Sequence, residues 1–154
     1  MNNVITKRYF KSIYLTLFFI FGIQSVYAKE EIIIPNYRVE LRDISVCIGI
    51  DTFLAKHHDS ISKIDNIITG YDLLASYERE KMRFLEKIKN EIIIPILLNK
   101  NENKDTINIM ASTVLMNTMD KLDKLSEVIK IKDLMIISDD CEVRYIKLNT
   151  EYTY

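Results

Sequence analysis

Residues 36–58 read NYRVELRDISVCIGIDTFLAKHH, and the spacing of the apolar side chains in this stretch decides the fold class. Apolar residues recur here every three or four positions, which is the spacing of one face of an α-helix; they are Tyr37, Leu41, Ile44, Cys47, Ile48, Phe53 and Leu54. Asn36 suits the N-cap position, because its side chain can accept a hydrogen bond from a free backbone N–H. The stretch predicts a first helix with Cys47 on its buried side.

The chain after residue 58 continues with the same helical spacing. Residues 60–94 carry a long apolar stripe that is most regular over 73–94, and Gly70 marks a point where the helix breaks or bends. Pro95 lacks a backbone N–H, so we expect the helix to end or kink near it.

Two more helices are expected in the remaining sequence. One covers about residues 105–130, where apolar positions again follow a helical period. Asp139 and Glu142 have the spacing of a capping box, so the last helix is expected to start near Asp139. Residues 134–137, just before it, fit either a helix end or a short buried strand.

These patterns together predict an all-α protein, a small bundle of four or five helices. The 154-residue chain has only 3 Gly and 2 Pro, too few for the many tight turns of a β-sandwich or barrel. Residues 29–154 are long enough to form a single domain with its own core.

Residues 1–28 have the pattern of a bacterial secretory signal peptide. The segment begins with three basic residues and no acidic one, Lys7, Arg8 and Lys11. An apolar core follows at 13–23, and Ala28 ends a cleavage-site pattern. We therefore expect a periplasmic or secreted protein that is free of the membrane after cleavage; an uncleaved N-terminal anchor is the alternative. Removal of three positive charges would change the net charge from −1 to about −4.

Cys47 and Cys141 are the only two cysteines of the chain. In an exported protein, an even number of cysteines points to a disulfide bond, and here only one pairing exists. The alternatives are a reactive thiol or a metal ligand, but neither cysteine belongs to a CxxC motif or has a histidine nearby at ligand spacing.

Several classes of function find no support in the sequence. The mixed, mildly acidic charge gives no electrostatic footprint for nucleic acid, and no nucleotide fingerprint, catalytic signature or cofactor motif is present. His57 and His58 are the only histidines; adjacent helical residues point about 100° apart, so a helix end suits them better than a metal or catalytic site. The acidic residues Asp139, Asp140 and Glu142 fit a helix cap better than a calcium site. We expect no metal, no cofactor and no enzymatic activity.

Two features are candidate partner-binding sites. The most polar run of the chain is predicted to be a loop, and loops often carry function; it comprises Asn99, Lys100, Asn101, Glu102, Asn103 and Lys104. Tyr77 departs from the apolar stripe of residues 61–74, which makes it the best candidate for an exposed aromatic side chain of the kind favoured at interfaces. Three methionines of one predicted helix fit either a core stripe or an adaptable binding surface, namely Met110, Met116 and Met119.

Two segments resemble the periplasmic immunity proteins of type VI secretion amidase effectors, the Tai-like family. The first helix of that family has a Leu-Ser-x-Cys-Leu pattern, and residues 44–48 read Ile-Ser-Val-Cys-Ile. A later helix of the family is similar to residues 108–125, which contain Asn-Ile-Met at 108–110 and Leu-Met-Asn-Thr at 115–118. The chain departs from the family at Ser112, where the family has a cysteine. A disulfide from Cys47 would therefore be connected differently here.

The resemblance implies a small helical inhibitor that blocks a secreted peptidoglycan hydrolase in the periplasm. Binding and inhibition of a protein partner is thus the expected function, and a homodimer is a further possibility. The alternative is a periplasmic chaperone or an accessory subunit of an envelope complex with no inhibitory activity. A small enzyme would need a pocket of convergent polar groups around His57 or His58.

Overall fold

In the computed structural model, the residues described are 36–65 and 70–152. They form four long helices, which are α2 (Tyr37–Asp65), α3 (Gly70–Ile88), α5 (Lys104–Leu125) and α6 (Ile131–Tyr152). A π-helical turn, η1 (Lys89–Ile93), and the short helix α4 (Ile94–Asn99) continue α3. No strand occurs within these residues, and the predicted all-α fold with one disulfide is confirmed. All of them belong to one compact unit, Pro35–Tyr154, whereas the predicted signal peptide lies outside the described residues.

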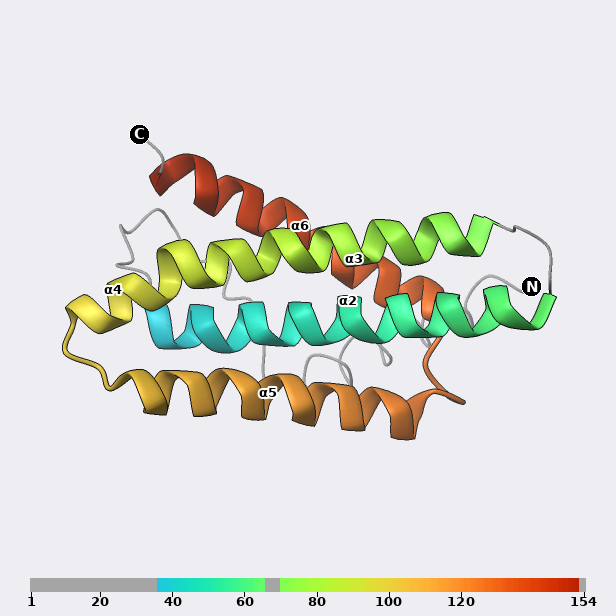
Figure 1. Cartoon of the computed structure of the whole chain (residues 1–154), viewed down its shortest axis with the longest axis horizontal. Helices are drawn as coiled ribbons and strands as arrows, with labels where there is room; N and C mark the ends of the chain where they lie inside the picture. Colours follow the sequence, from blue (N-terminus) through green and yellow to red (C-terminus); the bar gives the residue numbers. More distant parts are fainter. Residues whose placement is uncertain (1–35, 66–69, 153–154) are drawn as a thin grey trace, which may run out of the picture. The chain divides into compact units, whose positions relative to one another are not determined.

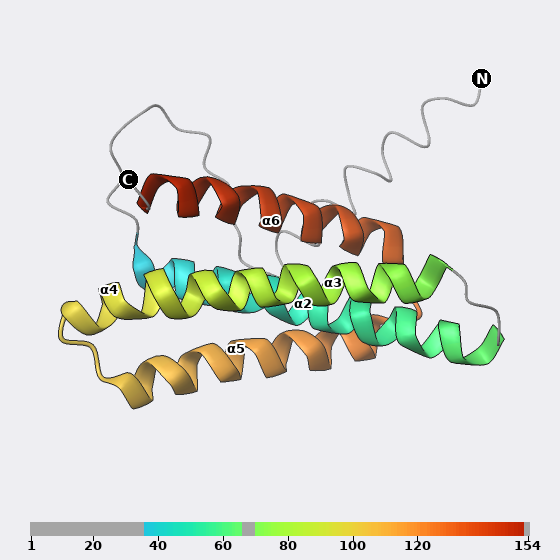
Figure 2. The same ribbon diagram turned by 45° about the horizontal axis from the view of Figure 1, so that its top comes forward.

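Helix α2 is the central helix of this unit. It packs against α3, α5 and α6, and Figure 1 shows it between α3 and α5 with α6 crossing behind. Helices α2 and α5 run in one direction and α3 and α6 in the other, and the turned view of Figure 2 places α6 and α5 on opposite sides of α2. Buried residues fall on every side of α2 between positions 43 and 51. A helix that is buried all round is expected at the centre of a bundle.

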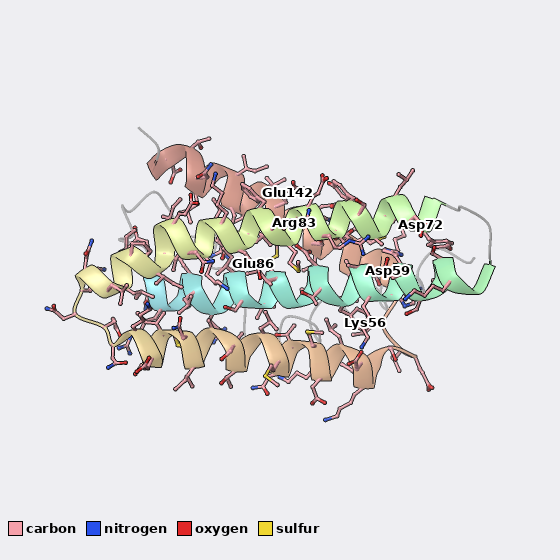
Figure 3. All side chains as sticks on the ribbon, in the orientation of Figure 1. Lys56, Asp59, Asp72, Arg83, Glu86 and Glu142 are labelled. Atoms are coloured by element: carbon pink, nitrogen blue, oxygen red, sulfur yellow. A yellow bond between two sulfur atoms is a disulfide. The ribbon has the colours of Figure 1, made fainter. Side chains whose placement is uncertain are left out.

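The first helix is longer than predicted. It continues past His58 to Asp65, because residues 59–65 contain no helix breaker and α3 gives this end of α2 something to pack against. Ser62 is hydrogen-bonded to Asp72 of α3, and Arg79 of α3 forms a 2.7 Å ion pair with Asp59; Asp59 and Asp72 are labelled in Figure 3.

Pro95 does not end the helical path. The backbone N–H of Ile94 donates to the carbonyl of Lys89, five residues back, which is the bond of a π-helical turn. Pro95 lies in the first turn of α4, a position where proline is tolerated. The helical rod therefore runs on to Asn99.

The limits of the last two long helices also differ from the prediction. Helix α5 ends at Leu125 rather than near residue 130, where Val128 is 80% exposed and offers the core no apolar face. Helix α6 begins at Ile131, so residues 134–137 are helical and the proposed cap at Asp139 is wrong. Ser138 and Asp139 lie inside α6 and have other roles.

The disulfide joins the central helix to the last one. Cys47 of α2 and Cys141 of α6 are bonded, their Cα atoms are 6.0 Å apart, and both side chains are buried. Gly49, two residues further along α2, lets α5 come close, since a Cβ at this position would lie 3.1 Å from the Thr118 side chain. Near Cys47, α2 is thus held to α6 by a covalent bond and to α5 by a close helix contact.

Candidate functional site

The polar run predicted as a loop joins α4 to α5, but the loop itself is shorter than predicted. Asn99 is the last residue of α4 and Lys104 is the first of α5, so only residues 100–103 lie between helices. Asn101 has a φ of 62°, a left-handed conformation that asparagine tolerates. The N–H groups of Asn101 and Glu102 donate to carbonyls of the last turn of α4 at 3.0 and 3.2 Å. This is the Schellman pattern that commonly closes a helix.

The other end of the loop is fixed just as firmly. The side-chain oxygen of Asn103 accepts hydrogen bonds from the backbone N–H groups of Asp105 and Thr106, at 2.8 and 3.1 Å, and so caps α5. Both ends of the four-residue loop are therefore closed by backbone and side-chain bonds of its own residues.

Two contacts tie the loop to the first turn of α2. Arg38 donates two hydrogen bonds to the carboxylate of Glu102, at 2.6 and 2.7 Å, in a planar paired geometry. This pairing holds the pKa of Glu102 below its ordinary value. The ammonium group of Lys100 lies 5.0 Å from the centre of the Tyr37 ring. These contacts leave the backbone of the loop, which carries its exposed side chains, little freedom to move.

Tyr77 is exposed as predicted, but it does not join the loop. Its side chain lies on α3 and is 45% exposed. The Lys81 ammonium is 4.5 Å from its ring centre, and its hydroxyl donates to Glu142 of α6 at 3.2 Å. The helical rod from Tyr77 to Lys100 is 23 residues long, which separates them by on the order of 30 Å. A single cleft of a partner would not receive both.

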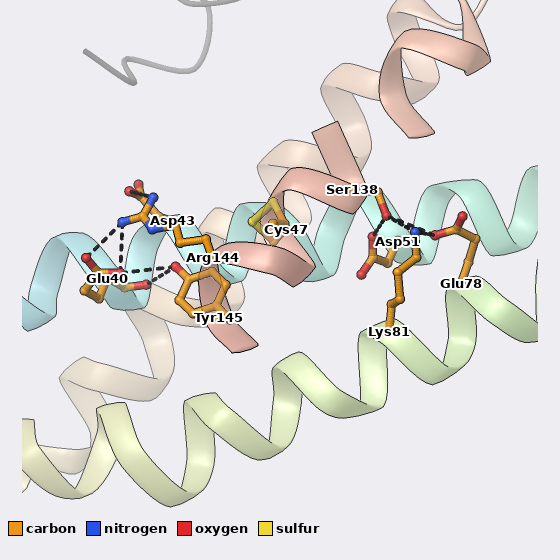
Figure 4. Close-up of a disulfide and its surroundings, with 10 residues drawn as sticks. Glu40, Asp43, Cys47, Asp51, Glu78, Lys81, Ser138, Arg144 and Tyr145 are labelled. Carbon is orange, nitrogen blue, oxygen red and sulfur yellow. Dashed lines mark hydrogen bonds and ion pairs between the residues drawn. A yellow bond between two sulfur atoms is a disulfide. The ribbon is translucent and has the colours of Figure 1, made fainter. Parts of the chain in front are cut away.

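Sequence reasoning missed a set of charged side chains inside the protein. Asp51 of α2, Glu78 and Lys81 of α3, and Ser138 of α6 meet where these three helices touch, and each is at most 2% exposed. We call these four residues the buried polar cluster; Figure 4 shows it on one side of the disulfide. Asp51 interrupts the apolar stripe of α2, which was the one signal available in the sequence.

The buried polar cluster has more acceptors than donors. The Lys81 ammonium is close to Ser138 at 2.5 Å, to Glu78 at 3.0 Å and to Asp139 at 3.0 Å, which uses its three protons. The Ser138 hydroxyl lies 2.7 Å from Asp51 and 3.1 Å from Glu78, but it has one proton to donate. One oxygen of each buried carboxyl group, Asp51 Oδ2 and Glu78 Oε1, has no hydrogen-bond partner within the described residues. Two buried carboxyl groups thus share one ammonium group and one hydroxyl.

This arrangement favours a proton on Asp51. The pKa of Asp51 is raised to about 7, mainly by burial and in smaller part by the neighbouring Glu78, against the opposing effects of the hydrogen bond from Ser138 and the charge of Lys81. Burial opposes the charge of Lys81, but its bonds to Asp139 and Glu78 prevail and raise its pKa above the ordinary value. Near neutral pH, Asp51 therefore exchanges a proton while Lys81 stays charged.

The histidines lie inside α2, so the expected position at a helix end is wrong. His58 is 2% exposed and its ring is 5.9 Å from that of Tyr71. Burial lowers the pKa of His58, which keeps the imidazole neutral. His57 stacks on Phe53 at 6.3 Å. No group of three or more His, Cys, Asp or Glu side chains within residues 36–65 and 70–152 is placed to hold a metal ion.

A second polar group lies on the other side of the disulfide (Figure 4). Arg144 of α6 donates to both carboxylate oxygens of Glu40 at 2.9 Å and lies 3.3 Å from Asp43 of α2. The Tyr145 hydroxyl donates to Glu40 at 3.3 Å, and burial raises the pKa of this phenol. These contacts satisfy the charges locally and hold α6 against the start of α2.

Chemically, the two kinds of site differ in access. The buried polar cluster can hold or release a proton, but side chains at most 2% exposed cannot receive a substrate. The loop presents fixed amide and ammonium groups to the surface and suits recognition.

No helix in the described part of the chain is long and apolar enough to cross a membrane. Comparisons with protein-family models, with curated proteins and with solved structures found no match to this chain.

Proposed function

We propose that this chain is an exported helical protein that binds and inhibits another protein, as an immunity protein against a secreted peptidoglycan hydrolase does. The disulfide is compatible with an oxidising compartment such as the periplasm. The observation that carries the proposal is the fixed geometry of the loop at residues 100–103.

A rigid loop suits inhibition for a thermodynamic reason. Binding has to offset the loss of motion of every side chain and backbone segment that becomes ordered, and a preformed loop has less motion to lose. The Arg38–Glu102 pair, the Asn103 cap and the left-handed turn at Asn101 all fix this loop before a partner arrives. The loop can therefore act as a wedge that occupies a partner's cleft without changing shape.

The mechanism we propose is occlusion. Lys100 and Asn101, which are exposed at the tip of the loop, would enter the cleft, and the bundle behind them would exclude the polymeric substrate. No catalytic group of this chain is needed for such a mechanism.

The test is inhibition of cell-wall digestion. Hydrolases secreted by the source cells are mixed with a suspension of purified peptidoglycan, and clearing of the suspension is followed with and without the purified protein. We expect loss of clearing at near-stoichiometric protein. Replacement of residues 100–102 by Gly-Ser-Gly, which keeps the Asn103 cap, should raise the concentration needed for half-inhibition by about tenfold or more.

The matched control replaces residues 126–128, the exposed turn between α5 and α6, by the same Gly-Ser-Gly sequence. This variant should inhibit like the unchanged protein. Equal potency of all three proteins would remove the loop from the mechanism. Failure of the unchanged protein to inhibit, together with suppression of aggregation of an unfolded client, would favour the chaperone alternative.

A further inference from the structure

Helix α5 contains the longest uncharged run of the described part of the chain. Residues 106–119, 14 in succession, include no Asp, Glu, Lys or Arg, although such residues make up 28% of the sequence. One side of this run packs on α2 through Ile107, Ala111 and Thr118, which are buried. The run spans about four turns of helix, so it also covers the outer side of α5.

The outer side of the run is exposed and carries only uncharged side chains. We call it the charge-free face of α5; it comprises Thr106, Asn108, Ile109, Ser112, Thr113, Met116 and Asn117. Ile109 is 64% exposed and Met116 is 67% exposed, so Met116 is not part of a core stripe. Figure 3 shows side chains projecting from α5 on the side away from α2.

The other long helices differ on their outer sides. Exposed positions of α3 include Glu80, Arg83 and Lys87, and exposed positions of α6 include Lys132 and Asp140. A surface helix normally carries such charges opposite its buried stripe. Depletion of charged residues and enrichment of methionine are features of the centres of protein–protein interfaces.

We infer that the charge-free face of α5, together with the adjoining loop at residues 100–103, is the docking surface for a protein partner whose groove is uncharged along its floor and carries a carboxylate at one end. The inference deepens the proposed function, on which it rests, by naming the chemistry of the surface that the partner must present.

The loop continues this face, because Asn103 caps the first turn of α5. Lys100 and Lys104 are both exposed there, and neither is in an ion pair within the described residues. Glu102, the carboxylate of the loop, is already paired with Arg38, and Asp105 is the other carboxylate at this end of the face. The two lysines outweigh this one aspartate, and a net positive charge at one end of an uncharged face matches a groove with an acidic end.

The size of the face argues against a second copy of this chain as the occupant. A run of 14 residues is about 21 Å long and a helix is about 10 Å wide, so two such faces laid together cover on the order of 200 Å² in projection. A stable interface buries about 800 Å² on each partner. A concave partner that encloses α5 on its exposed sides and also covers the loop can approach that area.

The experiment compares charge insertions at equal exposure. Met116→Glu and Ile109→Glu each place a carboxylate on the charge-free face, and Val143→Glu places one on α6, where Val143 is also 67% exposed. Glutamate is a good helix former, so the helix content measured by circular dichroism should be unchanged in all three variants. The readouts are half-inhibition of peptidoglycan clearing by the secreted hydrolases of the source cells, and the sedimentation coefficient of each protein alone.

We expect Met116→Glu and Ile109→Glu to raise the half-inhibitory concentration by about tenfold or more, and Val143→Glu to leave it unchanged. Inhibition that all three variants retain would overturn the docking surface and leave the proposed function standing. Absence of inhibition by the unchanged protein would overturn both. Self-association of the unchanged protein that Met116→Glu abolishes would assign the face to a second copy and also overturn the inference.

Discussion

The proton on Asp51 should make the stability of this protein depend on pH in an unusual direction. An aspartate has an ordinary pKa of 3.8, and burial raises the pKa of Asp51 to about 7 in the folded protein. Below about pH 4 the group is protonated in both the folded and the unfolded chain. Between about pH 4 and pH 7 the unfolded chain has lost the proton and the folded chain keeps it, so the free energy of unfolding falls as the pH rises.

The magnitude follows from the size of the shift. One pKa unit corresponds to about 1.4 kcal/mol, and the change from 3.8 to about 7 therefore corresponds to about 4 kcal/mol as an upper figure. Because small proteins have a total stability of about 5–15 kcal/mol, such a loss is large enough to measure.

The Asp51→Asn substitution isolates this effect. Asparagine has nearly the same shape, still offers an oxygen to Ser138, and carries no charge at any of these pH values. We expect the variant and the unchanged protein to differ little at pH 4, and the variant to be more stable at pH 8 by up to about 4 kcal/mol. Urea unfolding followed by circular dichroism from pH 4 to pH 8.5 measures the difference.

Asp43→Asn is the matched control, because Asp43 is also a buried acid of α2 but lies against Arg144 and Arg42. The substitution removes a buried carboxylate that both guanidinium groups contact, so this variant should be less stable than the unchanged protein at pH 8. Stability profiles of Asp51→Asn and the unchanged protein that run parallel over the whole pH range would refute the assignment of the proton to Asp51.

Three further predictions concern contacts that join α2 to other parts of the protein. Replacement of Cys47 and Cys141 by alanine opens a 94-residue loop and should lower the free energy of unfolding by up to about 5 kcal/mol, seen as a lower midpoint in urea; an unchanged midpoint would contradict a stabilising role. Gly49→Ala should cost about 1–3 kcal/mol, because its Cβ would press on Thr118 at 3.1 Å, and a stability equal to that of the unchanged protein would mean that α5 gives way freely. Arg38→Gln should change stability by less than about 1 kcal/mol but speed amide hydrogen exchange at residues 100–103; exchange at the unchanged rate would show that the ion pair does not hold the loop.

The helices could be predicted because each one buries an apolar stripe with a period near 3.6 residues. The disulfide followed from the cysteine count and the expected compartment. Tyr77 was correctly expected to be exposed, and the polar run at 99–104 does contain the loop. These features depend on local sequence, so one chain was enough to find them.

The errors arose where a local signal was overridden by packing. Asp139 looks like a cap, but α6 starts eight residues earlier, and the side chain pairs with Lys81 of α3 instead. Glu78 and Lys81 have the spacing of a solvated pair on a helix surface, yet both are buried because α6 covers them. The packing of the whole bundle decides which side of α3 is covered by α6. The periodicity of α3 alone does not predict that side.

The sulfur bridge has a kinetic consequence for the proton at Asp51. Cys141 lies one helical turn from Ser138, the residue through which α6 reaches the ionisable carboxyl group. When that carboxyl group ionises and α6 is loosened, the bridge still holds Cys141 against Cys47, so reclosing loses less chain entropy than it would if only the connecting chain joined the two helices. Alkaline exposure should therefore loosen α6 for as long as Asp51 stays ionised, and α6 should close again rapidly when the proton returns.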